Sequence, residues 1–264
     1  MLRSLRITLC LACLVLLTAP AAAQNFRMET DVFLAAEKKP LVQTLTLFTD
    51  SMVYDFIYGP ANGKDKEDQQ VTEVTVFDMS AGRVILLDIA KARKTVLSHE
   101  QLVQMTTAMK VHTGEKDGVY HFAADPKFTF KFEEEKLQLD GLSPNLIYRV
   151  KGQKPEQAAA AFRYQEFADW SARLNACRPG NLPPFARMEV GKELANRGLI
   201  PEEITRTMIA PGRLGNKRVE LTSRHHVNWL VSTKDRKRIE TVAEQIGTFE
   251  GVTFLSFAQA DKVK

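Results

Sequence analysis

The stretch 76–88 reads VFDMSAGRVILLD, two apolar runs joined by a polar, glycine-containing link. A hairpin with residues 79–82 in its loop places Asp78 opposite Arg83 and leaves Asp88 at the far end, five rungs away. At ~3.3 Å per residue the two aspartates are then roughly 16 Å apart. That separation is too large for two carboxylates that act on one glycosidic bond. The pattern therefore predicts a hairpin with strand-end charges rather than an acid–base pair.

This hairpin is apolar on both of its faces. In the same pairing, one face carries Val74, Val76, Ile85 and Leu87, and the other carries Phe77, Val84 and Leu86. A sheet face in contact with water normally carries polar residues. The sequence therefore predicts that something apolar covers each side, either helices or a bound ligand.

A second hairpin is predicted in LVQTLTLFTDSMVYDFIYG, residues 41–59, folded around Asp50 and Ser51. Its alternation has period two, as expected for a half-buried antiparallel pair in which Leu47 faces Tyr54. One face then collects Leu41, Leu45, Leu47, Tyr54, Phe56 and Tyr58.

The remaining elements are predicted from periodicity and from helix start and stop residues. Ser98 and Gln101 form a capping-box pattern for a helix that Gly114 ends, and Pro155 suits the first turn of a second helix. Further strands are expected at 127–133, 136–141, 145–150, 202–210, 217–232 and, as the last element, 251–259, with further helices at 154–180, 185–196 and 234–247. The fold class predicted is α+β, with a long antiparallel sheet.

The first residues, MLRSLRITLCLACLVLLTAPAAAQ, resemble a secretory signal peptide. Residues 1–23 are expected to be removed by cleavage after Ala23, which predicts an exported protein, periplasmic or secreted. The formal charge then falls from +4 to about +2, which disfavours nucleic-acid binding. Residues 24–264 contain no apolar run of membrane-spanning length. They are expected to form a single domain, in which residues 154–264 supply covering helices and final strands.

No catalytic, metal or cofactor signature emerges from the sequence. The zinc motif H-E-x-x-H would need a second histidine where Val103 follows His99. His225 and His226 are adjacent, so on a strand they point to opposite faces. Cys177, the cysteine left after signal cleavage, has no recognisable histidine partner. We therefore expect no enzyme activity, no metal and no cofactor.

The densest basic run is KDRKRIE, residues 234–240. Such a run is able to contact an anionic lipid head group or membrane surface. It is equally typical of the solvated face of a helix, which is the simpler interpretation.

The segments VYDF, VFDMSAGRVILLD and KARKTVL together resemble the unclosed half-barrel carriers of the bacterial lipoprotein-localisation type (LolA/LolB-like), and more closely a set of uncharacterised secreted bacterial proteins. The resemblance covers roughly residues 26–150. It implies a curved antiparallel sheet, an unclosed half-barrel with helices covering one face, whose concave face holds an acyl chain. It matches no ligand-gripping residue of that family to a position here.

The function predicted is non-enzymatic binding of a lipid, a lipoprotein acyl chain or another apolar ligand in the concave face. Strand parity suggests as its lining residues Leu45, Leu47, Tyr54, Phe56, Val74, Val76, Ile85 and Leu87. The alternative is a structural or protein-interaction module of the cell envelope, with a closed core and a protein partner. Burial of apolar area stabilises either arrangement equally, at ~25 cal/mol per Å².

Overall fold

The structure is a computed structural model that describes residues 25–59, 69–113, 118–212 and 215–259. The signal-peptide prediction and the helix stop at Gly114 lie outside these residues. The strands are β1 (Phe26–Leu34), β2 (Val42–Phe48), β3 (Met52–Tyr58), β4 (Val71–Asp78), β5 (Arg83–Asp88), β6 (Arg93–Ser98), β7 (Thr129–Glu133), β8 (Gln138–Leu142), β9 (Leu146–Gln153), β10 (Ile200–Gly212), β11 (Gly215–Asn228) and β12 (Glu250–Gly251). The helices are α1 (His99–His112), α2 (Val119–Ala124), α3 (Ala159–Ala176), α4 (Phe185–Ala195), α5 (Thr233–Thr248) and α6 (Phe254–Gln259).

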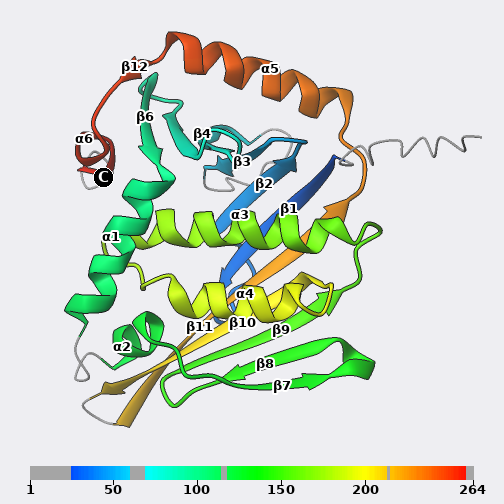
Figure 1. Cartoon of the computed structure of the whole chain (residues 1–264), viewed down its shortest axis with the longest axis vertical. Helices are drawn as coiled ribbons and strands as arrows, with labels where there is room; N and C mark the ends of the chain where they lie inside the picture. The colour runs from blue at the N-terminus through cyan, green and yellow to red at the C-terminus, as the bar shows by residue number, and fades with distance from the viewer. Residues whose placement is uncertain (1–24, 60–68, 114–117, 213–214, 260–264) are drawn as a thin grey trace, which may run out of the picture.

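The strands of the described residues form one 12-stranded sheet with the order β12-β6-β5-β4-β3-β2-β1-β11-β10-β9-β8-β7. Every pairing is antiparallel except that of β12 with β6. The sheet curves around α3 and α4 and does not close (Figure 1). The predicted α+β half-barrel is therefore confirmed.

The chain does not follow the sheet in simple order. It runs from β1 to β6 toward one edge, then crosses by way of α1 and α2 to β7 at the opposite edge. β10 and β11 return to the middle and pair with β9 and β1. The C-terminal part therefore supplies central strands as well as helices.

Both predicted hairpins have the expected register. Val76 pairs with Ile85 across β4 and β5, and Leu47 pairs with Tyr54 across β2 and β3. Leu41 is an exception on the predicted face, since it precedes β2 and is 61% exposed.

The two aspartates of the first hairpin organise turns. Asp78 accepts hydrogen bonds from Ser80 Oγ at 2.9 Å and from the Ala81 amide at 3.0 Å, and it pairs with Arg83 at 3.0 Å. Asp88 accepts one from Arg93 Nε at 3.0 Å. Burial alone would raise the pKa of Asp78, but the hydrogen bonds from Ala81, Ser80 and Arg83 outweigh it and lower the pKa.

The concave face is filled by helices. α3 buries Tyr164, Phe167 and Leu174 in a cluster that includes residues from strands β6 through β10 in sheet order. Phe167 makes edge contacts with Phe48 and Phe77, with ring centroids 5.4 and 5.3 Å away. A second cluster packs α4 against β8, β9 and β10. α3 therefore covers the face of the predicted hairpin that carries Phe77, Val84 and Leu86.

The prediction of a final strand at residues 251–259 is wrong. Only Glu250 and Gly251 pair with β6, and the chain then forms α6. The Thr253 hydroxyl accepts from the Ser256 amide at 3.3 Å, and the i, i+3 spacing of Phe254 and Phe257 places both rings against the concave cluster. The helical spacing outweighs the β propensity of the segment.

The start of α3 also differs from the prediction. The helix begins at Ala159 rather than near Pro155, and its N-cap Ala158 has no side chain able to cap it. Residues 154–158 instead carry the chain from β9 to the concave face. Among the described helices, none is long and apolar enough to span a membrane.

Candidate ligand-binding site

The predicted lining residues do come together in one cluster. Leu45, Leu47, Tyr54, Phe56, Val74, Val76, Ile85 and Leu87 are all buried and share the cluster with Val242 of α5. Their side chains alternate with those that contact α3, so they lie on the opposite face of the sheet. This corrects their predicted placement on the concave face, where the helices α3 and α4 lie.

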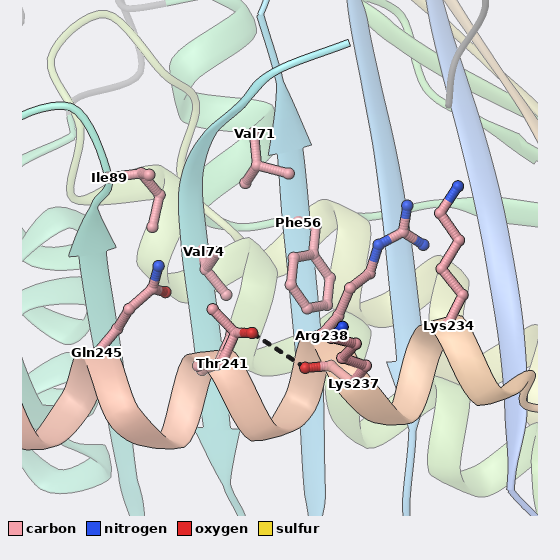
Figure 2. A pocket seen from close by; sticks show the side chains of 10 residues that line it. Phe56, Val71, Val74, Ile89, Lys234, Lys237, Arg238, Thr241 and Gln245 are labelled. Atoms are coloured by element: carbon pink, nitrogen blue, oxygen red, sulfur yellow. Dashed lines mark hydrogen bonds between the residues drawn. The ribbon is translucent and has the colours of Figure 1, made fainter. Parts of the chain in front are cut away.

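α5 covers this second face. Ser232 caps the helix in a reciprocal capping box with Asp235, and Val242 is 2% exposed beneath it. Ile239 and Ile246 pack on the same cluster, so the residues at i, i+3 and i+7 form the apolar stripe. Figure 2 shows the helix crossing the strands.

A charged network anchors the start of α5 to β1. Asp235 is fully buried and accepts hydrogen bonds from Arg27 and Arg238, both at 3.0 Å, and from Ser232 Oγ at 2.7 Å. Burial alone would raise the pKa of Asp235. The hydrogen bonds from Ser232 and the charges of Arg27 and Arg238 outweigh this effect and lower the pKa.

A cavity of about 330 Å³ lies between α5 and the sheet. Its lining residues are Phe56, Val71, Val74 and Ile89 from the sheet side and Lys234, Lys237, Arg238, Thr241, Val242 and Gln245 from α5. The volume falls at the lower end of the range for small-molecule sites. The floor is apolar and the helix side carries three cationic side chains, so the cavity suits a ligand with one apolar and one polar part.

Phe56 and Val74 are the predicted residues that line this cavity. The other predicted residues are buried in the same cluster without lining it. Sequence reasoning missed Val71, Ile89 and the contribution of α5. The signal that could have found α5 is its basic run, since Lys234, Lys237 and Arg238 recur at helical spacing together with Thr241 and Gln245.

Polar groups also lie on the concave face beneath α3. Thr46 Oγ1 donates to Asp55 Oδ1 at 2.8 Å, and burial raises the pKa of Asp55 to about 6 despite this bond. Arg187 donates to Tyr164 Oη at 3.0 Å. Burial raises the pKa of Tyr164, and the nearby Arg187 opposes the shift. The first pair links β2 to β3, and the second links α4 to α3.

The remaining candidates of the sequence are also placed. His225 contacts Thr30 Oγ1 at 3.0 Å and Ser223 Oγ at 3.1 Å, and burial lowers its pKa to about 3, whereas His226 is exposed. Burial raises the pKa of Cys177 to about 11, so its thiol stays protonated at neutral pH. Within the described residues, no group of three His, Cys, Asp or Glu side chains could hold a metal ion.

No protein-family model and no curated protein matches the sequence. Among solved structures, PNGF-II is similar with 8% identity and a TM-score of 0.30, over 88% of this chain and 31% of PNGF-II. The chain thus spans about a third of the length of PNGF-II. A porin-like protein from Bacteroides uniformis is similar with 9% identity and a TM-score of 0.25, over 78% of this chain and 97% of that one. The resemblance to LolA/LolB-like carriers has no support from a family model or a curated protein, and what the structure confirms is the unclosed half-barrel.

Proposed function

We propose that the protein is an exported, non-enzymatic carrier or sensor that binds the apolar chain of a lipid, such as an acyl group, under α5. The observation that supports this proposal is the cavity between α5 and the sheet, which has Phe56, Val71, Val74 and Ile89 as its apolar floor. Covering these side chains with an alkyl chain removes apolar surface from water at ~25 cal/mol per Å². The proposed ligand site therefore lies on the face of the half-barrel opposite to the concave face expected from the sequence.

The size of the cavity sets the kind of ligand. A volume of about 330 Å³ suits one chain rather than a two-chain lipid. The helix α5 forms one wall, and both Lys237 and Thr241 are exposed, so the polar end of a ligand reaches solvent at this wall. A single-chain amphiphile meets these conditions.

The proposal is tested by titrating the purified protein with a fluorescent polyene fatty acid and by mass spectrometry of lipids that co-purify with it. Val71→Phe replaces a small side chain of the cavity lining with a bulky aromatic ring, so it is expected to weaken probe binding at least tenfold. Val111→Phe is the matched control, because Val111 is 76% exposed on α1 and does not line the cavity. Absence of both probe binding and co-purified lipid would contradict the proposal and favour the alternative of an envelope interaction module.

A further inference from the structure

On α5, basic side chains face the cavity and acidic side chains do not. The cavity side of the helix carries Lys234, Lys237 and Arg238, whereas Glu240 and Glu244 are exposed and do not line the cavity. None of the residues that line it is an aspartate or glutamate. The helix side of the cavity therefore carries cationic side chains, with no carboxylate side chain in the lining.

The carboxylate that pairs with the lining residue Arg238 is already engaged by several groups. Asp235 is fully buried on the same helix, and its oxygens are engaged by Arg27, Arg238 and Ser232. Asp235 thus pairs with two arginines, and one of these, Arg27, also pairs with Glu29. Within the described residues Lys237 forms no ion pair and is exposed, so its ammonium group is able to meet a ligand.

From this arrangement, and resting on the proposed function, we infer that the ligand is an acidic single-chain amphiphile whose carboxylate or phosphate binds at Lys237 and Arg238. The apolar chain lies on Phe56, Val71 and Val74, and the anion lies at the solvent-facing wall. Lys237 is a point charge with three donors, and the part of the Arg238 guanidinium not used by Asp235 supplies further donors. With a neutral head group, the Lys237 and Arg238 donors would form no ion pair with the ligand and would stay hydrated.

The test compares ligands of equal chain length by calorimetry at pH 8: a fatty acid, the monoalkyl phosphate and the fatty alcohol. The acidic ligands are expected to bind about five- to tenfold more tightly than the alcohol, as for a partly exposed ion pair. This preference should shrink with added salt, because the charges lie near solvent. Whichever acidic ligand binds more tightly identifies the head group.

Two variants of neighbouring residues decide the assignment. Lys237→Ala is expected to remove most of the acid preference, because it removes one of the two cations that hold the anion. Arg236→Ala is the matched control, since Arg236 is exposed on α5 but does not line the cavity, and it should keep the preference. Equal binding of acid and alcohol, or equal losses in the two variants, would overturn the inference while leaving the proposed function standing. Failure of all three ligands to bind would instead contradict the proposed function.

Discussion

At the scale of single residues, the most informative groups are the partly buried carboxylates of the concave face. Asp55 has a pKa of about 6 because burial disfavours its charged form, and burial likewise raises the pKa of Asp169 to about 6. A folded-state pKa above the unfolded value of 3.8 means that the folded state holds the proton more tightly. The stability that Asp55 and Asp169 contribute in their protonated form is fully present below pH 3.8 and is lost as pH rises through about 6.

Asp55→Asn should therefore stabilise the protein at neutral pH. The asparagine is neutral and its carbonyl oxygen can still accept from Thr46 Oγ1. We expect the free energy of unfolding to rise by about 1–3 kcal/mol at pH 7.5, with little gain at pH 3.5. Urea unfolding of variant and parent at both pH values measures this difference. A gain that does not depend on pH would show that charge burial is not its cause.

Cys177 gives a second prediction at this scale. Its thiol donates toward the Arg173 carbonyl oxygen at 3.3 Å, and burial raises its pKa to about 11. Alkylation by iodoacetamide at pH 8 should be at least tenfold slower than for a free cysteine, because the thiolate is the reactive form. Mass spectrometry of a time course measures the rate. A rate equal to that of unfolded protein in urea would contradict the buried, protonated thiol.

At the scale of elements, α5 depends on the network around Asp235. Asp235→Ala would leave Arg27 and Arg238 without their shared carboxylate and should lower the free energy of unfolding by about 3–5 kcal/mol. Amide hydrogen exchange should accelerate first in α5, since its start is then no longer tied to β1. Glu240→Ala serves as the control, because Glu240 is exposed on the same helix and should change stability by less than about 0.5 kcal/mol. Unchanged exchange in α5 would contradict this anchoring role.

The elements also show how far sequence alone could predict the structure. The register of β4 and β5 followed from local alternation, since Val76 and Ile85 must share a face once the loop is fixed. The segment of α6 misled because valine and phenylalanine favour strands, whereas the helical spacing of Phe254 and Phe257 has its effect through packing on the concave cluster. Strand parity grouped Phe56 with Val74, but it could not tell which face meets α5, because that depends on contacts distant in sequence.

At the scale of the whole molecule, α3 joins the two halves of the half-barrel. Phe167 contacts Phe48 and Phe77, and the same cluster includes Val227 of β11. Phe167→Ala is expected to cost about 3–5 kcal/mol and to lower hydrogen-exchange protection in β4 and β11 together. Val190→Ala, on α4, should mainly affect β8 to β10 because Val190 belongs to the second cluster. Loss confined to one half in the Phe167 variant would contradict a shared core.

The two faces of the sheet differ in what covers them. α3 and α4 cover much of the concave face, where a pocket of about 320 Å³ remains between Leu86, residues 178–181 and α6, whereas the cavity of about 330 Å³ under α5 lies on the opposite face (Figures 1 and 2). Photo-crosslinking with a diazirine fatty acid, followed by peptide mapping, tests this placement most directly. We predict saturable adducts in peptides that contain Phe56, Val71, Val74 or residues 237–245. Adducts concentrated in α3 and α4, on the concave face, would contradict it.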